Sequence, residues 1–182
     1  RHPTSLMVRG AALTLVLLLP LLGPATPVLA EEDPPTYLYG WGTGGTDPGE
    51  FDDPRGLALD DDGNLFVVDS ANDRIQKFDA FGGFICEFGS SGTGDDQFVL
   101  PFDVVVDSYG DVWVSDYHYH CVKKFHDSGG NTYGHVLTLG TPGTPGSSDE
   151  MFWYPWGLSV DDEDNLYVAD KWNNCIKKFD RD

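Results

Sequence analysis

Two histidines, His118 and His120, lie two residues apart in a short segment of the chain. Imidazole is the commonest neutral metal ligand and the usual acid or base near neutral pH, so this pair is the sharpest candidate for chemistry. Two other segments share the pattern of this one, and they hold Asp73 and Asn174 at the position of His120. A site with one histidine from each segment is therefore excluded. Packing in a turn is favoured over zinc binding through His120.

Two acidic runs, residues 60–64 and 161–165, invite a calcium interpretation. Calcium takes six to eight oxygen ligands, and neither run has the spacing with a final glutamate that an EF-hand loop uses. Solvated hairpin turns are the favoured interpretation of both runs. The sequence contains no GxSxG, HExxH, phosphate-loop or dinucleotide-binding motif. No cofactor is predicted, and zinc and calcium are the weaker alternatives.

Aromatic side chains beside the histidines indicate binding more than catalysis. Tyr117, Tyr119 and Trp172 can stack on sugars or on peptide side chains, or they can pack against neighbouring loops. No catalytic residue is assigned. The predicted ligand-binding residues share one loop face, and they are Tyr117, His118, Tyr119, His120, Trp172 and Asn173.

A repeated scaffold must position these loops, because the chain contains three copies of one pattern. The copies begin at Phe51, Phe98 and Phe152, so the offset is 47 residues and then 54. The additional residues of the longer offset fall in connecting segments, where insertions are tolerated. A repeat of this length made of short β-rich runs is typical of propeller blades.

The first copy predicts four strands, at residues 56–60, 65–68, 74–78 and 84–88. The second strand is apolar on both faces, which is typical of a strand sandwiched between layers. The third strand alternates polar and apolar residues and is expected nearer the solvent. The segment Tyr37–Gly42 is similar to the fourth strand, so we expect an equivalent strand before the first copy.

An aspartate follows the second strand of every copy, at Asp69, Asp116 and Asp170. A short carboxylate in this place caps the free N–H groups of the turn that follows. These three residues are therefore predicted to be structural.

The repeats resemble the NHL repeat family. The resemblance rests on Phe-x-x-Pro-x-Gly from Phe51, on Gly63-Asn64 and on the run from Asn72 to Phe78. It implies an all-β, six-bladed NHL-type propeller, of which this chain contains about three four-stranded blades, either half of a ring or a fragment of one. The resemblance covers residues 37–182, as repeats of about 37–83, 84–137 and 138–182.

The first 30 residues are typical of a secretory signal peptide. They carry Arg1 and Arg9, no acidic residue and an apolar run that is too short and too interrupted by proline for a membrane span. Residues 31–36 form an acidic, proline-containing lead. We therefore expect a secreted protein without a stable membrane span after cleavage. The chain begins with Arg1 rather than methionine, so a longer parent protein is favoured.

The composition limits which partners the chain can bind and which state its cysteines can have. The formal charge of −19 repels phosphate backbones, so nucleic-acid binding is disfavoured. The three cysteines, Cys86, Cys121 and Cys175, are an odd number without metal-binding spacing. All three are expected to be mostly buried thiols.

Two functions follow as hypotheses. The favoured one is an exported, non-enzymatic module that binds a protein, a peptide or a glycan through its loop face. The alternative is part of a propeller metalloenzyme. The resemblance extends to the amidating lyases and lactonases, and His120 is placed similarly to a zinc ligand of the lyases. Since about three blades leave two blade faces open, self-association that closes a ring is a further expectation.

Overall fold

The computed structural model describes residues 34–181, and its regular structure is almost entirely β. The chain divides into two units, residues 1–38 and residues 39–182, and every described strand lies in the second. The predicted signal peptide lies outside the described residues. No helix within residues 34–181 is long and apolar enough to cross a membrane.

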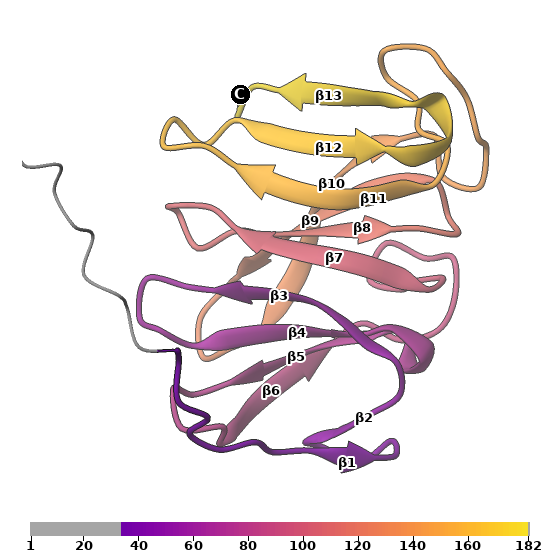
Figure 1. The fold of residues 1–182 in the computed structure, drawn as a ribbon. Helices are drawn as coiled ribbons and strands as arrows, with labels where there is room; N and C mark the ends of the chain where they lie inside the picture. Colours follow the sequence, from indigo (N-terminus) through magenta and orange to yellow (C-terminus); the bar gives the residue numbers. More distant parts are fainter. Residues whose placement is uncertain (1–33, 182) are drawn as a thin grey trace, which may run out of the picture. The chain divides into compact units, whose positions relative to one another are not determined.

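Three antiparallel sheets follow one another along the chain, and in each the neighbouring strands are consecutive in sequence (Figure 1). The first sheet contains β3 (Pro54–Leu59), β4 (Leu65–Asp69), β5 (Arg74–Phe78) and β6 (Phe84–Phe88). The second contains β7 (Pro101–Val106), β8 (Val112–Asp116), β9 (Cys121–Asp127) and β10 (Tyr133–Gly140). The third contains β11 (Pro155–Val160), β12 (Leu166–Asp170) and β13 (Cys175–Phe179). A short parallel pair, β1 (Thr43–Gly44) and β2 (Glu50–Phe51), precedes them.

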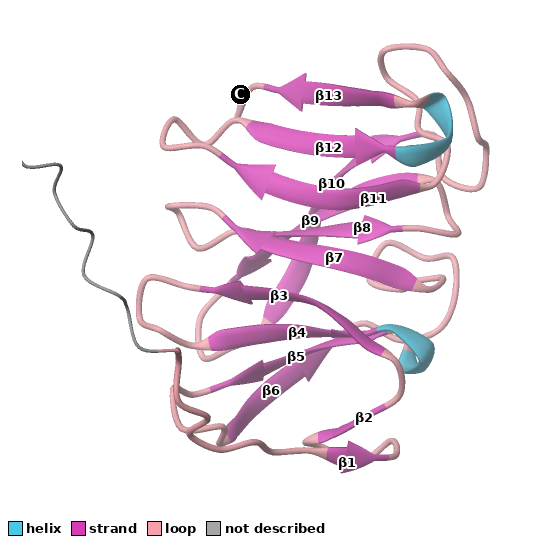
Figure 2. Cartoon of the chain, viewed as in Figure 1, coloured by secondary structure: helices cyan, strands magenta, loops and turns pink. Residues whose placement is uncertain are grey.

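The predicted blades are confirmed. The third and fourth strands predicted for the first copy coincide with β5 and β6, and the first two differ from β3 and β4 by one or two residues. The 3-10 helices η1 (Ser70–Asn72) and η2 (Lys171–Asn173) follow the second strand of the first and third sheets (Figure 2). The loops that carry the predicted ligand-binding residues therefore lie at one end of the sheets.

The sheets pack face to face and enclose two apolar cores. The first core lies between the first two sheets and includes Phe66, Phe98 and Phe125. The second lies between the second and third sheets and includes Trp113 and Phe152. Because every core is shared by two sheets, both faces of a middle sheet must be apolar, as the sequence of the second strand predicted.

The first strands of the three sheets form the inner edge of the stack, with β7 beside both β3 and β11. Gly56 on β3 makes the closest approach possible. A Cβ atom there would lie 2.6 Å from the Cα atom of Asp103 and 2.9 Å from the backbone nitrogen of Val104. Any side chain at this position would push the first two sheets apart.

The hairpin between the first two strands of each sheet has a left-handed residue. Gly63 and Gly110 have φ values of 80° and 77°, and Asp164 takes this conformation without glycine at 61°. The Asp60 carboxylate accepts hydrogen bonds from the backbone N–H groups of Asp62 and Asn64, so it closes its own turn.

Two strand predictions are wrong. Residues 37–42 do not form a strand, because they have no neighbouring strand to pair with among the described residues. The third strand does not lie nearer the solvent: all five residues of β5 are buried. Its polar side chains Arg74 and Gln76 are buried because other parts of the chain accept their hydrogen bonds.

The prediction of three buried thiols is also wrong. Cys121 is buried, Cys86 is half-buried and Cys175 is exposed, and all three are free. Cys121 and Cys175 occupy equivalent positions in β9 and β13. The difference arises because β10 pairs with β9, whereas no described strand pairs with the outer edge of β13.

Candidate functional site

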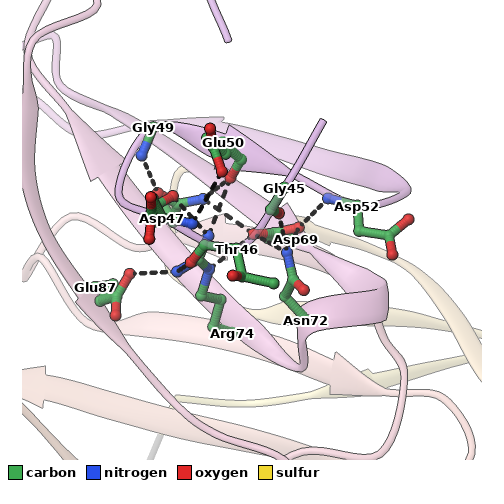
Figure 3. Close-up of polar contacts among 11 residues, drawn as sticks. Gly45, Thr46, Asp47, Gly49, Glu50, Asp52, Asp69, Asn72, Arg74 and Glu87 are labelled. Atoms are coloured by element: carbon green, nitrogen blue, oxygen red, sulfur yellow. Dashed lines mark hydrogen bonds and ion pairs between the residues drawn. The ribbon is translucent and has the colours of Figure 1, made fainter. Parts of the chain in front are cut away.

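A buried ion pair anchors the loop that follows β4. Arg74 Nε donates a hydrogen bond of 2.7 Å to the Asp69 carboxylate, which is fully buried. The Arg74 guanidinium also donates to the carbonyl oxygens of Thr46, Asp47 and Glu50 (Figure 3). One cation thus ties the segment before the first repeat to the end of β4.

The other two sheets reach the same arrangement with a different residue. Cysteine replaces Arg74 in both, and a lysine stands where the first sheet has Gln76. Lys123 lies 3.3 Å from the Asp116 carboxylate, and Lys177 lies 3.0 Å from that of Asp170. Each lysine also donates to carbonyl oxygens of the segment that leads into its repeat. The cation and its backbone acceptors are retained while the side chain changes.

The three aspartates do not cap the turns that follow them, which corrects the predicted mode of action. No side-chain capping bond is present at Asp69 or Asp170. Instead, Asp69, Asp116 and Asp170 accept the backbone N–H of Asp52, Val99 and Trp153, each 17 residues earlier. Burial raises the pKa of Asp116 to about 7, although the Val99 N–H and the Lys123 ammonium lower it.

His120 connects the second sheet to the third. Its backbone is left-handed, with φ of 57°, and its Nδ1 accepts the backbone N–H of Tyr154 at 3.2 Å. Asp73 is the equivalent residue one repeat earlier. Its backbone is also left-handed, and its carboxylate accepts the N–H of Leu100. Burial lowers the pKa of the His120 imidazole, and the neighbouring His118 lowers it further. His120 therefore acts here as a neutral hydrogen-bond acceptor.

Replacing His120 separates its backbone role from its imidazole. His120→Asn is expected to leave stability almost unchanged, because Asn tolerates the left-handed region and its carbonyl can accept the Tyr154 N–H. His120→Leu should lower the free energy of unfolding by about 2 kcal/mol through backbone strain and the lost hydrogen bond. Urea unfolding of both variants measures the difference, and equal stabilities would contradict this role.

The variant His120→Asn also tests how the stability of the chain depends on pH. Since the pKa of His120 is lower in the folded chain than in the unfolded chain, the unfolded chain binds the proton first as pH falls. Stability from this group is present above the unfolded pKa of about 6.5 and is lost as pH falls below it. His120→Asn should remove this part of the pH dependence.

Four side chains form a ladder at the loop end of the inner edge. The Arg55 guanidinium lies over the Phe102 ring at 4.8 Å, and the ring centres of Phe102 and Trp156 are 3.6 Å apart. Lys171 Nζ lies over the Trp156 ring, 3.6 Å from its centre. Arg55, Phe102 and Trp156 each follow the proline that starts the first strand of a sheet. Repetition of the sheet therefore stacks them.

Further rings extend this ladder outward. Tyr117 lies 4.7 Å from Tyr154 and 5.4 Å from Trp156, measured between ring centres. Trp172 lies 5.2 Å from Tyr154 and 5.4 Å from Trp153. We call the set the aromatic platform, and it consists of Arg55, Phe102, Tyr117, Trp153, Tyr154, Trp156, Lys171 and Trp172.

Partly buried hydrogen bonds fix the backbone beneath the platform. Ser115 Oγ donates to the carbonyl oxygen of Trp156, and the Asp103 carboxylate accepts the N–H of Leu158 at 2.8 Å. Burial raises the pKa of Asp103. These bonds join the second sheet to the third, so the rings contributed by both sheets are held in place before any ligand binds.

The structure brings together only some of the predicted ligand-binding residues. Tyr117, His118, His120 and Trp172 gather around Tyr154. Tyr119 lies elsewhere, with Lys123 Nζ 5.4 Å from its ring centre. The Asn173 amide donates to the Gly146 carbonyl and to Asp170, so it holds the loop.

Several platform residues were not predicted from the sequence. Phe102 and Trp156 lie at the start of a strand and Tyr154 lies just before one, rather than in the loops that were searched. The signal was nevertheless present, because an aromatic residue follows the repeated proline in two of the three copies. Within residues 34–181, no group of three or more His, Cys, Asp or Glu side chains is arranged to hold a metal ion.

Stacked antiparallel sheets joined at an inner edge by their first strands define a β-propeller. The sequence model of the NHL repeat matches residues 51–78 and 152–179. The chain therefore contains NHL repeats, as its sequence predicted. The second sheet has the same strand order although the family model does not match its sequence. A comparison with curated protein sequences finds no match.

Solved structures show the same fold at low sequence identity. A streptogramin B lyase is 18% identical with a TM-score of 0.53, and the match covers 79% of this chain and 44% of the lyase. A protein of unknown function from Bacteroides thetaiotaomicron is 23% identical with a TM-score of 0.57, covering 74% of this chain and 35% of that protein. An auxiliary nutrient binding protein from Bacteroides ovatus is 14% identical with a TM-score of 0.54, with the same coverage of 74% and 35%. The chain thus spans less than half of each structure.

Proposed function

We propose that this chain is an exported, non-enzymatic NHL β-propeller module that binds a glycan through the aromatic platform. The observation that carries the proposal is the ladder of Arg55, Phe102, Trp156 and Lys171, which places stacked rings from two sheets at the loop end. Rings held by their own scaffold lose little conformational freedom when a ligand binds, so such a surface favours recognition.

The outer rings are the ones that a ligand can reach. Trp172 is 52% exposed and Trp153 is 38% exposed, whereas the inner Trp156 is covered by Phe102 and Lys171. Exposed flat rings with polar groups beside them suit the apolar face of a sugar ring. His118, whose ring centre lies 5.5 Å from that of Tyr154, and Asn174, two residues after Trp172, are both exposed and offer hydrogen bonds. The similarity to a nutrient binding protein agrees with a binding role but shows only the fold.

Glycan-array screening of the purified chain, followed by calorimetry with the best ligand, tests the proposal. Trp172→Ala should weaken binding of that glycan about fivefold or more, because a stacked ring contributes about 1 kcal/mol or more. Phe81→Ala is the matched control, since Phe81 is 86% exposed in a turn away from the platform. Its affinity should equal that of the unmodified chain.

Two outcomes would overturn this proposal. Unchanged affinity in both Trp172→Ala and Tyr117→Ala would place the binding surface elsewhere. Binding of a peptide library on the same rings, with no glycan bound, would retain the surface but replace the ligand class.

A further inference from the structure

The outer face of the first sheet exposes positions that are buried inside the stack. Leu57 on β3 is 61% exposed, whereas the equivalent Val104 on β7 is fully buried against the first sheet. Leu59 is exposed in the same way. Gly40, Trp41 and Phe51 line an apolar hollow of about 360 Å³ beside Leu57. This face has the composition of a sheet that packs on another sheet.

The outer face of the third sheet has the complementary property. Ile176 on β13 is 67% exposed, and its equivalents Ile75 and Val122 are fully buried in the two cores. The face that carries Ile75 packs on the next sheet, and so does the face that carries Val122. The third sheet therefore presents the surface that, within this chain, always contacts the face carrying Leu57 or its equivalent.

The segment that ends at Gly42 forms no strand, but its last residue is placed like the residue that ends or follows the fourth strand of a sheet. Gly42, Gly89 and Gly140 have φ values of 92°, 91° and 97°. A Cβ atom on each would meet the ring of the phenylalanine that starts the following repeat, at 2.5, 2.4 and 2.8 Å. Gly89 and Gly140 follow or end the fourth strands β6 and β10. Gly42 ends a segment in the same position. Among the described residues, however, this segment has no third strand of a sheet to pair with.

Residues with a left-handed backbone make a hydrogen bond that joins each sheet to the next. Asp73 accepts the N–H of Leu100, and His120 accepts the N–H of Tyr154, in each case from one sheet to the next. Asn174 and Asp53 occupy the two corresponding positions at the opposite ends of the stack, both with φ of 54°. They would make the same hydrogen bond if the third sheet packed against the first sheet of another copy.

We propose that two copies of this chain associate head to tail and close a ring of six sheets. In each of the two equivalent interfaces, β13 of one copy pairs with the segment ending at Gly42 of the other. The pairing of Cys121 with Gly140 and of Ile75 with Phe88 sets the register. By that register, Cys175 lies opposite Gly42 of the second copy, and Ile176 lies opposite Trp41. The contact repeats the interface that already joins the sheets of one chain.

Light scattering on a sizing column, with the full chain, tests this association. A mass twice that of one chain is expected, and Ile176→Glu should raise the dissociation constant about a hundredfold or more because it places an unpaired charge in an apolar contact. Ile176 is exposed within one copy, so this change should leave the circular dichroism spectrum unaltered. Val136→Glu is the matched control, because Val136 is an exposed apolar residue on β10, outside both faces.

Thiol labelling provides an independent measurement at the strand edge. The labelling rate of the exposed Cys175 should fall with increasing protein concentration, while that of the half-buried Cys86 should stay constant. A monomer at all concentrations would overturn the proposal, as expected if only further blades of a longer chain cover these faces. Open assemblies larger than two copies would also overturn it, and so would a dimer that is insensitive to both Ile176→Glu and Leu57→Glu.

Discussion

Arg74→Ala is expected to lower the free energy of unfolding by about 3–5 kcal/mol, because it leaves the buried Asp69 carboxylate without its cation. The carbonyl oxygens of Thr46, Asp47 and Glu50 would each lose one donor at the same time. Urea unfolding followed by tryptophan fluorescence measures the loss. A loss below about 1 kcal/mol would contradict the structural role of this cluster.

The second and third sheets suggest a double variant that should restore the lost stability. Arg74→Cys combined with Gln76→Lys gives the first sheet the residues that the second sheet has at Cys121 and Lys123. The double variant should recover most of the stability that Arg74→Cys alone loses, since the new lysine can reach both the carboxylate and the carbonyl oxygens. If the double variant is no more stable than Arg74→Cys, the two clusters are not interchangeable.

Phe125→Ala is expected to cost about 3–5 kcal/mol of unfolding free energy through the cavity that it leaves. The Phe125 ring is buried between the first two sheets, 5.1 Å from the ring centre of Phe88 and 5.4 Å from that of Phe98. Because rings of both sheets line this cavity, neither sheet can fill it alone.

Phe81→Ala serves as the matched control for Phe125→Ala. Phe81 is exposed in the turn between β5 and β6, so its loss should change the free energy of unfolding by no more than about 0.5 kcal/mol. Thermal or urea unfolding of the two variants side by side gives the comparison. Equal losses would show that the core between the first two sheets is not what holds them together.

The strands could be predicted from the sequence because the repeat supplies three independent copies of each one. The polar residues Arg74, Gln76 and Lys77 nevertheless gave the wrong exposure for the third strand. A polar residue type does not say whether the side chain meets water or buried carbonyl oxygens. Strand formation at residues 37–42 failed for another reason, since a strand requires a neighbour that the local sequence does not reveal.

The candidate site could be predicted only in part. Tyr117 and Trp172 were found because they lie in the loops where binding residues were sought. Phe102 and Trp156 were not, because they come from different repeats and meet only when the first strands lie side by side. Asn173 was predicted to bind a ligand, but its amide donates to Asp170 and holds its own loop. A polar side chain in a loop therefore does not by itself indicate a binding residue.

The order of strands within each sheet has a consequence for biosynthesis. Because hydrogen-bonded neighbours are always consecutive in sequence, a sheet can complete its pairing as soon as its last strand leaves the ribosome. The cation of each cluster likewise bonds segments fewer than thirty residues away, as Arg74 does with Thr46 and Glu50. Each blade could thus fold in turn during translation, and only its second apolar face must await the next one.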